Sequence, residues 1–129
     1  MSFIQESKTI LIVEDETSLR HALRDKLTRE NFAVLEAKNG EEGLEVALRE
    51  HPDLILLDIV MPKMDGMTML RKLRSENEWG KSVHVIILTN LSDNEKVAEA
   101  LEQKSQEYLV KSDWKIEDVV AKVRERLER

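Results

Sequence analysis

The chain has 129 residues, of which 41% are apolar and 36% are charged, and its formal net charge is −6. This size favours one folded domain of ordinary globular composition. The excess negative charge argues against binding to nucleic acids or to anionic membranes, because their phosphates would be repelled. The absence of cysteine excludes disulfides and thiolate zinc sites. With no apolar signal or membrane segment in MSFIQESK, we expect a cytoplasmic protein without a membrane partner.

The first half of the chain alternates short apolar runs with helical periodicity. Residues 1–7 are expected to form a short arm, and ILIV at 10–13 is apolar and β-branched, as in a buried strand. Leucines at every fourth position of TSLRHALRDKLTRE predict an amphipathic helix. AVLEA at 33–37 predicts a second strand. A second helix is expected between the turn at Asn39-Gly40 and the stop at His51-Pro52.

The second half repeats the same alternation. LILL at 54–57, VHVIIL at 83–88 and EYLV at 107–110 predict three further strands. Helical patterns are expected over 67–76, over 93–103 and from Ile116 to Leu127. Strands that are apolar throughout indicate a parallel sheet covered on both faces. The sequence therefore predicts a doubly wound α/β fold with five strands and five helices, whose ligands sit beyond the carboxyl ends of the strands.

Chemically useful side chains follow four of the five predicted strands. Glu14 and Asp15 come after the first strand, Asp58 after the third, Thr89 after the fourth and Lys111 after the fifth. The second strand ends in Glu36-Ala37-Lys38, which is less suggestive. Since parallel strands end at one edge of the sheet, several carboxylates and one ammonium would converge there.

Converging carboxylates repel one another unless a cation lies between them. Oxygen ligands without nearby histidine or cysteine indicate Mg²⁺, with Mn²⁺ or Ca²⁺ as alternatives, rather than zinc. A phosphoryl group at this edge would meet a metal, a hydroxyl and an ammonium, which are the groups that phosphoryl transfer requires. A carboxylate can itself be the nucleophile, and Asp58 is the natural candidate. In MPKMDG, Pro62 and Asp65-Gly66 predict that the chain turns sharply after it.

Four segments in order, ILIVEDE, LILLDIVMPKMDG, VIILTN and EYLVKSD, resemble the receiver domain of bacterial two-component response regulators. The resemblance covers residues 8–129 and is strongest to the stand-alone chemotaxis type. It implies a flavodoxin-like sheet of strand order 2-1-3-4-5. It also implies a single domain that catalyses only its own phosphorylation and dephosphorylation.

The resemblance assigns a role to each matching position. Asp58 would be the phosphoacceptor, Asp15 a direct Mg²⁺ ligand and Glu14 a ligand through water. The backbone carbonyl of Val60 would complete the protein ligands. Thr89 would be the switch hydroxyl, Lys111 the cation that pairs with the phosphoryl group, and Tyr108 the aromatic side chain that moves with Thr89.

The resemblance also implies the partners. The phosphoryl group would come from a histidine kinase or a histidine phosphotransfer protein. The signal would leave through the face formed by the fourth helix, fifth strand and fifth helix, to an output protein that the sequence does not name. The chain would be a monomer or a phosphorylation-dependent dimer. Ser112, Asn90 and Lys104 depart from the family pattern, which places reaction rates and output coupling in question more than phosphorylation itself.

Two other classes remain as alternatives. One is a binding module that keeps the receiver fold but works without phosphorylation, although the presence of Asp58, Asp15 and Lys111 argues against it. The other is a phosphohydrolase with an aspartate nucleophile. Such enzymes usually carry a second aspartate two positions after the nucleophile, where this chain has Val60.

Overall fold

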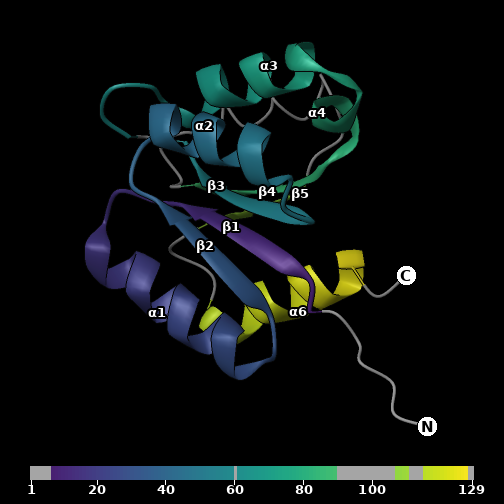
Figure 1. The fold of residues 1–129 in the computed structure, drawn as a ribbon. Coiled ribbons are helices and arrows are strands. Elements are labelled where there is room, and N and C mark those ends of the chain that lie inside the picture. The colour runs from purple at the N-terminus through teal and green to yellow at the C-terminus, as the bar shows by residue number, and fades with distance from the viewer. Residues whose placement is uncertain (1–6, 60, 90–106, 111–114, 128–129) are drawn as a thin grey trace, which may run out of the picture.

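The computed structural model describes residues 7–59, 61–89, 107–110 and 115–127, and these residues form an α/β fold with a parallel sheet at its centre (Figure 1). The strands are β1 (Thr9–Val13), β2 (Ala33–Ala37), β3 (Leu54–Asp58), β4 (His84–Thr89) and β5 (Glu107–Val110). All neighbouring strands pair in parallel, in the order β2-β1-β3-β4-β5. The predicted fold class and strand order are therefore confirmed.

Helices cover both faces of this sheet. They are α1 (Thr17–Arg29), α2 (Gly40–Glu50), α3 (Gly66–Glu76), α4 (Glu78–Ser82) and α6 (Ile116–Leu127). Figure 1 shows α2, α3 and α4 on one face and α1 and α6 on the other. The helix predicted over 93–103 lies outside the described residues. Among the helices that are described, none combines the length and apolar character needed to cross a bilayer.

The two faces of the sheet have separate hydrophobic cores. Leu11, Val13, Ile55 and Leu57 pack toward the α2–α3 side, together with Met69 and Leu73. The alternate strand residues Ile10, Ile12, Leu54 and Leu56 pack toward the α1–α6 side, together with Leu23, Leu27 and Val123. Because successive strand side chains point to opposite faces, a strand buried on both faces must be apolar throughout. This requirement explains the runs ILIV and LILL.

The short helix α4 was not predicted, because five residues are too few to show a helical period. Its first turn is capped by the Asn77 side chain, which accepts a hydrogen bond from the Gly80 backbone N–H at 2.7 Å. Arg74 of α3 donates from Nη1 to the backbone carbonyls of Gly80 and Val83, both at 2.8 Å. Burial lowers the pKa of Arg74 because desolvation disfavours its charged form. α4 and its C-cap residue Val83 are thus fixed to α3 by two backbone carbonyls that accept from one nitrogen of a buried guanidinium.

Candidate functional site

The site begins where β1 and β3 end side by side. Val13 lies opposite Leu57 in the β1–β3 register, so the next residues along the two strands are Glu14 and Asp58. Both are buried, with exposed fractions of 0% for Glu14 and 3% for Asp58. Asp15 follows Glu14 and is exposed. Two buried acids therefore lie beneath one that reaches solvent, at the carboxyl edge of the sheet.

The three carboxylates form a cluster that suits a hard divalent cation. One oxygen from each of Glu14, Asp15 and Asp58 lies within 4.8 Å of the other two. Octahedral Mg²⁺ binds oxygen at about 2.0–2.1 Å, so opposite ligands of one ion are about 4.2 Å apart. The cluster consists only of oxygen donors and needs little adjustment to reach these distances. These residues therefore fit the predicted Mg²⁺ or Mn²⁺ site, and Glu14, Asp15 and Asp58 would hold the ion.

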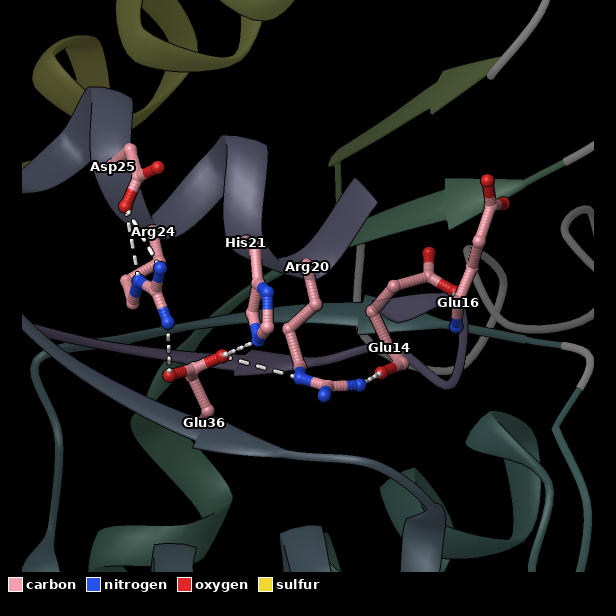
Figure 2. Close-up of polar contacts among 7 residues, drawn as sticks. All are labelled: Glu14, Glu16, Arg20, His21, Arg24, Asp25 and Glu36. Atoms are coloured by element: carbon pink, nitrogen blue, oxygen red, sulfur yellow. Dashed lines mark hydrogen bonds and ion pairs between the residues drawn. The ribbon is translucent and has the colours of Figure 1, made fainter. Parts of the chain in front are cut away.

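Hydrogen bonds fix Glu14 on three sides. Its backbone N–H donates to the carbonyl of Ala37 at 3.0 Å, which extends the β1–β2 pairing by one residue. Its side-chain Oε2 accepts from the backbone N–H of Glu16 at 3.1 Å. Its backbone carbonyl accepts from Nη1 of Arg20 at 2.9 Å (Figure 2). The residue that leads into Asp15 is therefore held by its N–H, its side chain and its carbonyl together.

Two glycines let the loop after Asp58 approach its neighbours closely. The Gly66 N–H donates to the carbonyl of Ile59 at 2.8 Å, and a Cβ at Gly66 would lie 2.1 Å from the Asp58 carbonyl oxygen. The Gly40 N–H donates to the carbonyl of Met64 at 3.0 Å, and a Cβ at Gly40 would lie 2.2 Å from that Met64 oxygen. A side chain at either position would push the loop away, so both glycines are required for this geometry.

The loop itself turns as MPKMDG predicts. Lys63 has a positive φ of 67°, a backbone conformation that residues other than glycine, asparagine or aspartate seldom adopt. Asp65 then caps α3, since its Oδ1 accepts from the Thr68 backbone N–H at 2.8 Å. The turn carries the chain from the end of β3 directly into α3.

The remaining predicted site residues are placed only in part. Leu88 lies opposite Asp58 in the β3–β4 register, so Thr89, the next residue of β4, ends at the same edge of the sheet. In β5, the backbone of Tyr108 pairs with Ile87 of β4. The side chains of Thr89 and Tyr108, and Val60 and Lys111 entirely, lie outside the described residues. The roles of these four residues stay predictions.

Arg20 and Glu36 lie beside the site, and the sequence alone assigned no role to either of them. Glu36 of β2 accepts from Nε of Arg20 at 3.2 Å, and Nη1 of Arg24 lies 3.4 Å from its other oxygen. Nε2 of His21 lies 3.8 Å from Glu36 (Figure 2). The available signal was an acid inside the otherwise apolar run AVLEA, beside a helix with bases at 20, 21 and 24.

Comparisons with known proteins agree with this geometry. The family model described as the response regulator receiver domain matches residues 10–124. The response regulator ArlR of Staphylococcus aureus is 38% identical over 120 residues, which are 93% of this chain and 52% of that protein. A protein of Porphyridium aerugineum named probable transcriptional regulator ycf27 is 36% identical over 124 residues, or 96% of this chain and 50% of that protein. The chain thus spans about half the length of these curated relatives.

A solved structure shares the fold. The CheY-like response regulator receiver domain protein of Methanospirillum hungatei aligns with a TM-score of 0.86 and 28% identity, covering 95% of each chain. The family match extends over both ends of the sheet and includes the acidic cluster at its carboxyl edge. The chain belongs to the response regulator receiver family and is a receiver domain of the kind found in two-component response regulators.

Proposed function

We propose that Asp58 accepts a phosphoryl group from a phosphohistidine on a histidine kinase or on a histidine phosphotransfer protein, with Mg²⁺ or Mn²⁺ bound beside it. The observation that supports this most directly is the cluster of Glu14, Asp15 and Asp58, of which two members are buried. Burying like charges side by side is unfavourable, and a protein that works without a cation or a phosphoryl group has little reason to keep them.

In the proposed reaction, a carboxylate oxygen of Asp58 attacks phosphorus and forms an acyl phosphate. The phosphorus–nitrogen bond of the donor breaks, and its electron pair goes to the imidazole nitrogen, which takes up a proton. Hydrolysis later returns the carboxylate and releases inorganic phosphate. The cation, when bound, reduces the negative charge that the phosphoryl oxygens present to this acidic edge. Catalysis by the chain is limited to these two steps on its own aspartate.

Four further roles belong to this proposal. The Val60 carbonyl would be a third protein ligand of the metal. Lys111 would pair with the phosphoryl oxygens and Thr89 would bond to one of them, while Tyr108 would move as Thr89 moves. Membership of the receiver family and the position of Thr89 at the end of β4 support these roles.

The output would also follow the family pattern. Phosphorylation would shift a two-state equilibrium, and the signal would leave through the face formed by the helix predicted over 93–103, β5 and α6. The occupant of that face would be another protein, either an output partner or a second copy of this domain. Within this proposal, residues 1–7 are an arm, residues 8–129 are the receiver, and the protein works in the cytoplasm.

Intact-mass spectrometry after incubation with acetyl phosphate and Mg²⁺ tests the proposal. We expect one added phosphoryl group that requires Mg²⁺ and is lost in Asp58→Asn. The matched control is Asp53→Asn, which changes an exposed aspartate at the other end of β3 and should leave the adduct intact. An adduct that persists in Asp58→Asn would contradict the assignment. If beryllofluoride, a phosphoryl mimic, also fails to bind the wild type, the chain is a binding module that works without phosphate.

A further inference from the structure

Arg20 connects the acidic cluster to the edge of the sheet. Its side chain is only 12% exposed, and it lies on α1, the helix that follows Glu14 and Asp15 in the chain. The guanidinium contacts two elements at once, with Nε 3.2 Å from Glu36 Oε1 on β2 and Nη1 2.9 Å from the Glu14 carbonyl oxygen. Figure 2 shows the group lying flat between these two acceptors. A planar guanidinium can span two such acceptors, whereas the single ammonium of lysine cannot hold both in the same geometry.

Glu36 orients this guanidinium. The Glu36 side chain is only partly exposed, at 29%, and its carboxylate faces three basic side chains of α1, those of Arg20, His21 and Arg24. Arg24 also contacts the Glu36 carboxylate, and its Nε donates to Oδ1 of the neighbouring Asp25. Of these three side chains, Arg20 is the one that also donates to the backbone of the acidic cluster. The chain therefore contains two arginines, on one helix and with one common partner, that differ in their contact with Glu14.

The bond from Arg20 acts on the peptide between Glu14 and Asp15. Its oxygen is the Glu14 carbonyl, and the N–H at the other end of this peptide belongs to Asp15, the exposed acid of the cluster. Holding the oxygen restrains the plane of the peptide, and with it the position of the Asp15 Cα from which the side chain leaves the backbone. An open pocket of about 180 Å³ lies beside Arg20, His21, Glu36 and Lys38. Water from this pocket can replace the hydrogen bond of a missing guanidinium without fixing the peptide.

We infer that Arg20 is a positioning residue for the metal site: bridged to Glu36, it sets the orientation of the Glu14–Asp15 peptide and so the direction of the two carboxylates toward Asp58. The inference deepens the proposed function, on whose metal site it rests. It adds to that site a residue that touches neither the metal nor the phosphoryl group. Loss of a group that orients metal ligands usually weakens metal binding by about 10–100-fold.

The test compares matched substitutions of the two arginines by Mg²⁺ titration calorimetry, with the melting temperature measured in the absence of metal. We expect Arg20→Met to weaken Mg²⁺ binding about tenfold, whereas Arg24→Met, which loses a contact with the same Glu36, leaves the affinity within about twofold of the wild type. Both variants remove one positive charge from α1. The difference between them therefore reports the bond to Glu14 rather than the net charge.

The charge-preserving pair separates the effect of charge from that of geometry, while the melting temperature shows whether each variant folds. Arg20→Lys keeps the charge but not the two-sided contact, so we expect it to weaken Mg²⁺ binding as well, while Arg24→Lys does not. Full recovery of affinity in Arg20→Lys would overturn the positioning role, because charge alone would then suffice. Equal affinities in the wild type, Arg20→Met and Arg20→Lys would overturn it too, with the metal site intact. A wild type that binds no Mg²⁺ would overturn the proposed metal site and this inference together.

Discussion

Asp53 and Asp58 lie at the two ends of β3, and they have the same side chain but different surroundings. Asp53 precedes the strand, is exposed, and accepts the Thr9 backbone N–H with Oδ2 at 2.7 Å, while its own N–H donates to the Thr9 carbonyl at 2.8 Å. Asp58 ends the strand, is 3% exposed, and lies within 4.8 Å of two other carboxylates. The acid at one end of β3 closes the pairing with β1, while the acid at the other end faces like charges.

The comparison teaches that a strand-end acid is defined by its neighbours. Asp53 has a backbone donor that satisfies its charge, so its presence stabilises the sheet. Asp58 shares a buried position with other acids, so its presence is expected to cost stability in the absence of a cation. Groups that reduce stability and yet occupy a fixed geometry are typical of functional sites. Substitutions at the two ends of the strand should therefore differ in their effects on stability and on metal affinity.

The largest effect is expected for Gly66→Ala, which alters the functional end of β3. The new methyl group would lie 2.1 Å from the Asp58 carbonyl oxygen, and we expect the free energy of unfolding to fall by about 3 kcal/mol. Gly80→Ala is the matched control, because its methyl group would lie 2.1 Å from the Leu73 carbonyl oxygen, away from the cluster. Urea denaturation should show both losses, but only Gly66→Ala should weaken Mg²⁺ binding. Equal metal affinity in the two variants would contradict the role given to Gly66.

A slightly smaller effect is expected from Mg²⁺ itself. At about 100 times its dissociation constant, a ligand that binds only the folded state adds about 2.7 kcal/mol of stability. Thermal unfolding with and without Mg²⁺ should show this gain in the wild type and in Asp53→Asn, and should show little of it in Asp15→Asn. Retention of the full gain in Asp15→Asn would remove Asp15 from the set of metal ligands.

The sign of the stability change caused by Asp58→Asn is expected to depend on whether Mg²⁺ is present. Asp58→Asn removes one charge from the buried cluster, so without Mg²⁺ we expect the variant to be more stable than the wild type by about 1–2 kcal/mol. With saturating Mg²⁺ the order should reverse, because the wild type gains the stability of metal binding and the variant does not. Chemical denaturation under both conditions measures the difference. A variant that is less stable than the wild type without metal would show that Asp58 is satisfied by its protein neighbours alone.

The smallest effect is expected at the other end of the strand. Asp53→Ala loses the bond to the Thr9 N–H and should lower the free energy of unfolding by about 1 kcal/mol, since the site is exposed. Asp53→Asn keeps an oxygen acceptor and should lose less. Neither variant should change Mg²⁺ affinity, and a change in either would mean that the two ends of β3 are coupled.

The sequence was sufficient to predict the sheet and its acidic edge. The apolar runs ILIV and LILL must be apolar throughout because both faces of the sheet are covered, and this pattern indicates parallel strands. Once the strands are parallel, the residues that follow them meet at one edge, which is how Glu14, Asp15 and Asp58 come together. Periodicity predicts the shared edge, whereas the order that makes β1 and β3 neighbours was implied by the resemblance to receiver domains and is the order that the sheet has.

Other parts required the structure. The helix α4 was missed because its stability comes from the Asn77 cap and from Arg74, a cation buried nine residues before Val83, whose carbonyl it binds. The link from Glu36 through Arg20 to Glu14 was missed because it depends on which side of α1 faces β2. A charged residue on a predicted helix carries no sign of whether it reaches solvent or a neighbouring backbone. Such contacts depend on tertiary packing, which the spacing of residues does not determine.

The loop after β3 is held at two points by main-chain hydrogen bonds alone, from Gly40 to Met64 and from Gly66 to Ile59. An anchor made of peptide groups does not depend on the side chains carried between its ends. A change confined to an exposed side chain between these points, such as that of Lys63, therefore leaves both anchors in place, provided that the new residue accepts the positive φ at 63. The outer surface of the loop can thus change its charge, for example in Lys63→Asn, while the acidic cluster beneath it keeps its geometry.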